Sequence, residues 1–126
     1  MTTEPADGAA ALRAALRLGL TTAMKSRDRD ALAALRTAIA AIDNAEAVPA
    51  PDAAPAATSA HVAGARSGLG AAEAARRELT ASELQDILRG QISERTLEAD
   101  RYDALGQADS AERLRRQAHA LAPYLP

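Results

Sequence analysis

Two blocks of the chain, residues 9–47 and 79–126, carry apolar residues at helical spacing. The first predicted helix covers Ala9–Lys25, and its apolar stripe repeats every fourth residue: Leu12, Leu16, Leu20 and Met24. Gly19 lies inside this helix, where a glycine costs about 1 kcal/mol relative to alanine unless it lets another helix approach closely. The first block therefore predicts an amphipathic helix with one unexplained glycine.

A second helix is predicted over Arg29–Ala47, because prolines follow it at 49 and 51 and an apolar seam runs along it. The seam consists of Leu32, Leu35, Ile39 and Ile42, and it is widened by Ala31, Ala38 and Ala45. The polar run Ser26–Asp30 separates the two helices, and Asp28 is a candidate N-cap for the second one. Alternatively, this run is a kink within one long helix.

The third helix has the clearest start signal in the chain. Thr80 and Glu83 have the spacing of a capping box, in which each side chain accepts a hydrogen bond from the other residue's backbone amide. Leu79 and Leu84 occupy the positions of a hydrophobic staple around this cap. The sequence therefore predicts that the helix starts directly after Thr80.

The third and fourth helices are predicted to form an antiparallel hairpin. The face of the third carries Leu84, Leu88, Ile92, Ala99, Tyr102 and Leu105, with Ile87 beside it and Arg95 close by. Gly106 is the residue type expected just after a helix end. The fourth helix starts near residues 107–109, carries Leu114, Ala118 and Leu121, and ends at prolines 123 and 126. A short turn between two helices favours antiparallel packing.

The remaining segments have the composition of irregular chain. Residues 1–8 are expected to form a disordered tail, and residues 48–78, rich in Ala, Pro and Gly, a mobile linker with a short helix near residues 71–77. No segment alternates with period two, so no strand is expected. We expect an all-α fold: one helical domain over residues 9–126, a small bundle of about four helices in two hairpins joined by the linker.

Composition narrows the chemistry. The chain has 126 residues, no Cys and 2% aromatic residues, and much of its 48% hydrophobic content is alanine. The core is therefore expected to be thin and built on leucine, and thiol chemistry, disulfides and Cys-based metal sites are excluded. No apolar run reaches the length of a membrane span, and nothing resembles a signal or transit peptide. We expect a cytoplasmic protein.

No catalytic, cofactor-binding or metal-binding constellation emerges from the motifs. His61 and His119 lack partners at metal-binding or base-positioning spacings, and the run Gly68–Gly70 lacks the rest of a nucleotide-binding fingerprint. The carboxylates are expected to form solvated intrahelical ion pairs, Glu98 with Arg101 and Glu112 with Arg115 or Arg116. No cofactor or metal is expected.

Basic clusters are the one pattern that points to a polyanionic partner. Arg113, Arg115 and Arg116 on the fourth predicted helix are the candidate contacts for RNA or for another partner. Acidic residues accompany these arginines, the formal net charge is -2, and no aromatic residue is interleaved for base stacking. A solvated face is therefore favoured over a phosphate-binding one.

The order of several short motifs resembles GatB/YqeY-like proteins. The first half carries Ala23-Met24-Lys25-Ser26-Arg27-Asp28, then Leu35-Arg36 and Ile42-Asp43-Asn44-Ala45-Glu46. The second half carries Leu79-Thr80, Glu83-Leu84, Ile87-Leu88, Glu94-Arg95, Tyr102, Leu105-Gly106 and the ending Tyr124-Leu125-Pro126, similar to the family's Tyr-Leu-Pro signature.

This resemblance implies an all-helical, non-catalytic module associated with tRNA-dependent amidotransfer or tRNA metabolism. Family members typically continue beyond Tyr-Leu-Pro into a small helical domain linked to tRNA contact, so the resemblance implies weak tRNA binding here. Two alternatives remain open: an accessory subunit of a carbon–nitrogen ligase with glutamine as amido-N-donor, and a tRNA- or RNA-binding helical protein. Glutamine hydrolysis needs an activated Cys or Ser, and the Ser residues lie in no nucleophile motif: Ser59, Ser67, Ser82, Ser93 and Ser110. The expected partner is another protein, bound through an exposed helical face.

Overall fold

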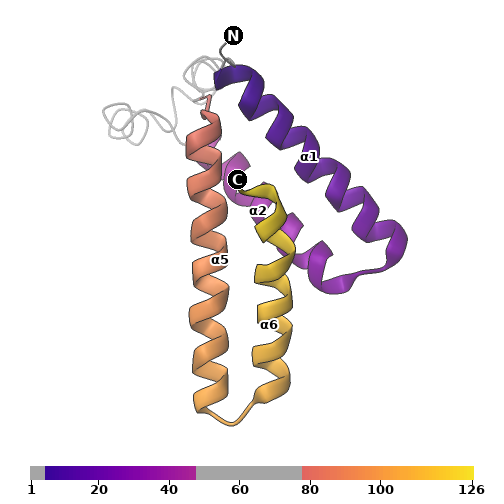
Figure 1. Ribbon diagram of the computed structural model, residues 1–126, viewed down its shortest axis with the longest axis vertical. Coiled ribbons are helices and arrows are strands. Elements are labelled where there is room, and N and C mark those ends of the chain that lie inside the picture. The colour runs from indigo at the N-terminus through magenta and orange to yellow at the C-terminus, as the bar shows by residue number, and fades with distance from the viewer. Residues whose placement is uncertain (1–4, 48–77) are drawn as a thin grey trace, which may run out of the picture.

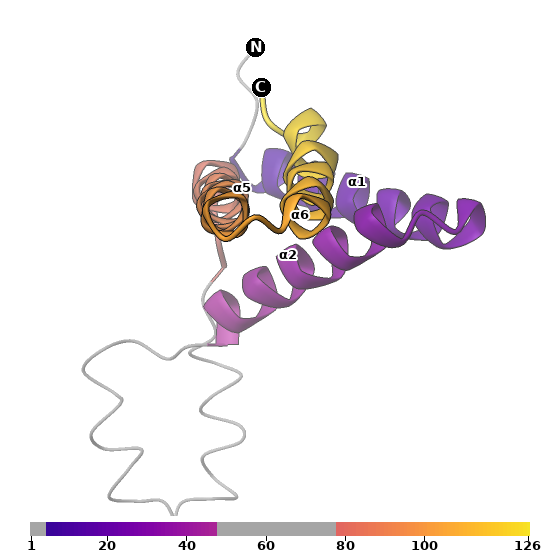
Figure 2. The same ribbon diagram turned by 90° about the horizontal axis from the view of Figure 1, so that it is seen from below.

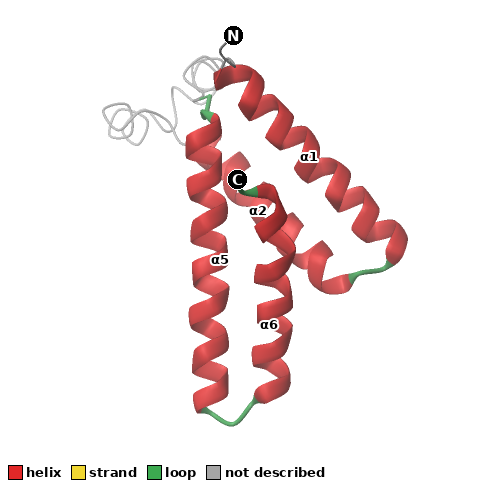
Figure 3. Cartoon of the chain, in the orientation of Figure 1, coloured by secondary structure: helices red, strands yellow, loops and turns green. Residues whose placement is uncertain are grey.

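The structure, a computed structural model, describes residues 5–47 and 78–126. These residues form four α-helices and a short 3₁₀ helix, and no strand occurs among them (Figure 3). The elements are α1 (Pro5–Ser26), α2 (Arg29–Ala47), α5 (Ala81–Ala104), α6 (Ala108–Leu121) and the 3₁₀ helix η2 (Ala122–Tyr124). The predicted all-α fold class is therefore confirmed.

Helices α5 and α6 form the predicted antiparallel hairpin, and α1 and α2 form a second, more open one (Figure 1). The view along the first hairpin shows α2 crossing it, in contact with both α6 and α5 (Figure 2). Helices α1 and α5 begin side by side, where a Cβ on Gly8 would lie 3.3 Å from the Cβ of Ala81. From that end α1 and α6 diverge (Figure 1).

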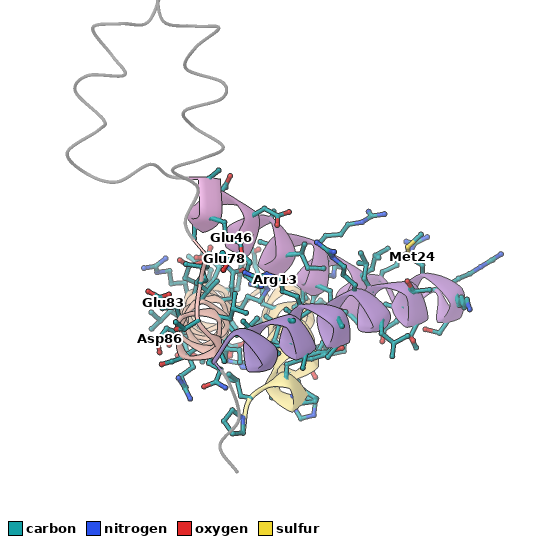
Figure 4. The ribbon with its side chains drawn as sticks, turned by 90° about the horizontal axis from the view of Figure 1, so that it is seen from above. Arg13, Met24, Glu46, Glu78, Glu83 and Asp86 are labelled. Atoms are coloured by element: carbon teal, nitrogen blue, oxygen red, sulfur yellow. The ribbon has the colours of Figure 1, made fainter. Side chains whose placement is uncertain are left out.

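Leucine and alanine side chains from all four helices make the core, as the composition indicated. The largest fully buried side chains are Leu16, Leu84, Leu88 and Leu121, and small residues such as Ala34 and Ala38 fill the spaces between helices. The assignment of two residues to the apolar stripes is wrong, because Met24 is 53% exposed and Leu105 is 70% exposed. Both lie at helix ends that extend past the neighbouring helices, and Figure 4 shows Met24 far from the core.

The α1–α2 connection consists of only Arg27 and Asp28. The amide of Arg27 donates to the carbonyl of Met24 (3.3 Å) and that of Asp28 to the carbonyl of Ala23 (2.9 Å), the paired bonds of a Schellman motif. Arg27 takes the left-handed position with φ 59°, where glycine is usual. The Asp28 carboxylate accepts from the amide of Ala31 at 3.1 Å, so it is the predicted N-cap and the single kinked helix is excluded.

The ends of α5 follow the sequence signals closely. The Thr80 hydroxyl accepts from the Glu83 amide at 3.1 Å, and the Glu83 carboxylate accepts from the Thr80 amide at 2.9 Å, which confirms the capping box. Leu79 and Leu84 are both buried, as a hydrophobic staple requires. At the other end Gly106 has φ 77° and closes a second Schellman motif through Gln107 and Tyr102.

Helix α1 begins earlier than the periodicity indicated. It starts at Pro5, so residues 5–8, assigned to the N-terminal tail, are helical instead. Proline suits the first position of a helix because its missing amide would have no partner there and its fixed φ is already helical. The rest of the predicted tail, the linker up to residue 77, the short helix near 71–77 and His61 lie outside the described residues.

Candidate functional site

The open side of the bundle is a groove between α1, α2 and the C-terminal end of the chain. One hollow of about 530 Å³ is lined mainly by apolar or small residues, among them Ala15, Leu18, Gly19, Leu35 and Tyr124. A second hollow of about 470 Å³ lies between α2 and α6 and shares Asp28, Ala31 and Ala120 with the first. We call the two together the α1–α6 groove, and Leu18, 68% exposed, lies on its wall.

Tyr124 closes one end of the groove against Gly19. A Cβ on Gly19 would clash with the Tyr124 hydroxyl and would lie 3.5 Å from Leu35 Cδ1. The glycine inside α1 therefore allows a close approach, as its position suggested, although the approaching group is a side chain of η2 and not a helix. The Tyr-Leu-Pro ending is thus anchored on α1, since Tyr124 and Leu125 both pack against the core.

Two of the three candidate arginines on α6 are held by carboxylates of the same chain. Arg115 Nη2 lies 3.0 Å from Asp100 and 2.6 Å from Asp103, both on α5, so it links the two helices of the hairpin. Arg116 Nε lies 2.8 Å from Asp30 and links α6 to α2. Hydrogen bonds to Asp103 and Asp100 raise the pKa of Arg115, and the hydrogen bond to Asp30 raises that of Arg116.

The third candidate, Arg113, is exposed and forms no ion pair with any residue of 5–47 or 78–126. The predicted pair of Glu98 with Arg101 is present at 3.0 Å. The predicted pairing of Glu112 with Arg115 or Arg116 is wrong, because those arginines bind carboxylates on neighbouring helices instead. Spacing along one helix does not reveal such partners, because they depend on how the helices cross.

Two carboxylates beside the groove form no ion pair in the described part of the chain. Asp28 and Glu112 both line its second hollow, and neither forms an ion pair within the described part of the chain. The charge of Glu112 also raises the pKa of Arg116, but it ranks below the hydrogen bond to Asp30 and the charge of Asp30. His119, also on this wall, is exposed, as expected for a solvated histidine. This end of the groove therefore offers negative charge to a partner.

The α1–α2 hairpin carries a further ion pair that the sequence did not indicate. Arg13 on α1 and Glu46 on α2 bind each other, with side chains only 27% and 12% exposed (Figure 4). Because the pair is largely shielded from solvent, it resists screening by salt better than the surface pairs do. It joins the two helices at the end opposite to their short turn.

Arg95 is the one buried charged residue in the described part of the chain. It lies between α5 and α6, where Nε donates to Gln117 Oε1 at 3.1 Å and Nη1 donates to Gln91 Oε1 at 2.8 Å. Burial lowers the pKa of Arg95, and nearby Glu94 opposes that shift. Both partners are neutral amides, so the guanidinium is hydrogen-bonded but not neutralised.

Within residues 5–47 and 78–126, no group of three or more His, Asp or Glu side chains is placed to hold a metal ion. Ser82, Ser93 and Ser110 lie on α5 and α6, and no histidine hydrogen bonds to any of them in this part of the structure. None of the helices in the described ranges is long and apolar enough to cross a bilayer.

Comparisons with protein-family models, curated proteins and solved structures gave no match for this chain. Kinship with GatB/YqeY-like proteins therefore stays a prediction from the motifs.

Proposed function

We propose that this chain is a non-catalytic, cytoplasmic helical module of the GatB/YqeY-like kind that acts by binding another protein. One contrast on its surface carries the proposal: Arg115 and Arg116 are engaged by carboxylates of the same chain, while the apolar α1–α6 groove lies open. An open apolar surface with a polar rim is typical of a protein interaction site. The motif order in both halves supports a setting in tRNA-dependent amidotransfer.

The test is capture of partners by the tagged full chain from native lysate, with and without nuclease. We expect a protein that remains bound after nuclease treatment and is lost when the groove is altered by Leu18→Ser. The matched control is Leu97→Ser, because Leu97 on α5 is similarly exposed, at 58%, but does not line the groove. Capture that disappears with nuclease would argue for RNA as the ligand and against this proposal.

RNA binding through α6 is the second candidate, favoured by exposed Arg113. Binding to phosphates driven by counterion release weakens steeply with salt, and a net charge of -2 gives no long-range attraction. We therefore expect filter binding to tRNA to be weak at low salt and negligible near physiological salt. Submicromolar binding at both salt concentrations, lost in an Arg113/Arg115/Arg116→Ala triple variant, would replace the protein-binding proposal with an RNA-binding one.

A role as accessory subunit of a glutamine-dependent carbon–nitrogen ligase is compatible with the same module. The chain has no Cys, the residue type most readily activated as a nucleophile for glutamine hydrolysis. We expect the purified chain to release no glutamate from glutamine. If it does so in proportion to its concentration, the module has chemistry of its own and the non-catalytic proposal is wrong.

A further inference from the structure

The walls of the α1–α6 groove show which backbone conformation an occupant needs. They are built from α1, α2, α6 and η2, whose backbone groups are mostly hydrogen-bonded within those elements. An extended peptide would therefore find few backbone partners in the apolar hollow, and each unpaired buried amide or carbonyl costs free energy. A helix satisfies its own backbone groups before it binds. The groove consequently favours a helical occupant.

The side chains of the groove also indicate the surface of that helix. Apolar contact is available from Leu18, which is 68% exposed, and from the half-buried Tyr124. Small residues at Ala15 and Ala31 allow an approaching helix to come close to the floor. An amphipathic helix with anchors three and four residues apart meets these conditions.

The charged residues beside the groove indicate the charge that an occupant should carry. At the end of the groove between α2 and α6, the cations are already paired: Arg116 with Asp30, and Arg115 with two carboxylates of α5. Asp28 and Glu112 remain without an ion pair among the described residues, and both line the same hollow. A basic side chain placed here gains attraction, and an acidic one is repelled.

We propose that the α1–α6 groove binds an amphipathic helix of a partner protein whose apolar face contacts Leu18 and Tyr124 and whose Lys or Arg lies beside Asp28 and Glu112. This inference rests on the proposed function, because it names the kind of partner that the module binds. It excludes an extended peptide and an acidic helix as the occupant.

The first test uses synthetic peptides on the full chain, with binding read from fluorescence anisotropy. Two amphipathic helices of about 18 residues, five turns, share one apolar face and differ only in Lys or Glu at one end. We expect the Lys peptide to bind more tightly, and Leu18→Ser to weaken it about tenfold. Leu97→Ser is the control and leaves binding unchanged. A proline-interrupted peptide of equal composition is expected not to bind.

The charge contacts are tested by variants that keep the fold. Asp28→Asn keeps the N-cap, because asparagine caps helices as well as aspartate does, and Glu112→Gln keeps the size of the side chain. Each is expected to weaken the Lys peptide about two- to fivefold, as for a solvent-exposed ion pair, and to leave the Glu peptide equal or stronger. Unchanged circular dichroism shows that the fold is intact.

Three results would overturn the inference. The first is equal binding of the Lys and Glu peptides, and the second is peptide binding that Leu18→Ser leaves unchanged. The third is a dimer, seen in sedimentation, that Leu18→Ser dissociates, because the groove is then occupied by a second copy of the chain. If the peptides fail while nuclease-resistant capture of a protein persists, the proposed function stands and only the groove assignment is lost. If both fail, the protein-binding function falls as well.

Discussion

Replacing Gly19 with alanine sets two known effects against each other. In the interior of a helix, alanine is favoured over glycine by about 1 kcal/mol, so helix propensity alone predicts a more stable protein. In this structure the new Cβ would overlap the Tyr124 hydroxyl. Overpacking of this kind costs about 1–3 kcal/mol. We therefore expect Gly19→Ala to lower the free energy of unfolding by about 0–2 kcal/mol, the difference between the two terms.

A double-mutant cycle separates the two effects. Tyr124→Ala removes the obstructing side chain, so Gly19→Ala in that background is expected to stabilise the protein by about 1 kcal/mol. The coupling energy between the two positions is then about 1–3 kcal/mol, within the range for residues in contact. Because the hydroxyl is the tip of a side chain that can swing away, we expect a value near the lower end.

The assay is urea unfolding of the four proteins, followed by far-ultraviolet circular dichroism. Equal slopes of free energy against urea would show that the variants unfold from equally compact states, so that shifts in midpoint report stability. The reasoning is refuted if Gly19→Ala stabilises the protein by the same amount with and without Tyr124. In that case the C-terminal tyrosine does not lie over α1, and the closed end of the groove is wrongly placed.

Three further predictions concern the core, a helix cap and the buried arginine. Leu88→Asp is expected to unfold the domain and Ile39→Asp to destabilise it strongly but less, because Leu88 is fully buried and Ile39 only partly; melts that rank them oppositely would contradict the packing. Thr80→Ala is expected to cost about 1 kcal/mol in urea unfolding, and a change within error would place the start of α5 elsewhere. Gln117→Leu should destabilise by about 1–3 kcal/mol because it leaves a buried guanidinium donor unpaired, whereas Arg95→Met should cost less; equal losses would show that Arg95 itself holds the hairpin.

Local signals in the sequence identified the ends of the helices well. Three of these signals depend only on residues close together in the chain, so the sequence contains every residue that the interaction needs. They are the capping box at Thr80, the N-cap at Asp28 and the glycine at 106. Proline at position 5 is a local signal of the same kind, although the segment around it lacks the apolar periodicity that predicts a helix. Periodicity also extended the stripes to Met24 and Leu105, since it cannot show where a neighbouring helix stops.

The features of the candidate site depend on how the helices cross, and the crossing angles could not be predicted from the sequence. Arg116 binds Asp30 across 86 positions of the chain, and no spacing rule along α6 could have selected that partner over Glu112. The sequence pattern places Arg95 only close to the apolar stripe, whereas in the structure it is buried and hydrogen-bonded to Gln117 of the facing helix. The α1–α6 groove likewise exists because α1 and α6 diverge, which no local pattern encodes.

The two-residue connection between α1 and α2 bears on the thermodynamics of recognition. Arg27 stays in a left-handed conformation that costs a non-glycine residue about 1–2 kcal/mol, and the Schellman bonds with the Asp28 cap hold it there. The angle between two walls of the groove is therefore set when the protein folds, before any partner arrives. A partner meets a preorganised surface, so the entropy lost on binding falls mainly on the partner's own helix. Affinity should consequently respond more to the intrinsic helicity of the partner than to loosening of this turn.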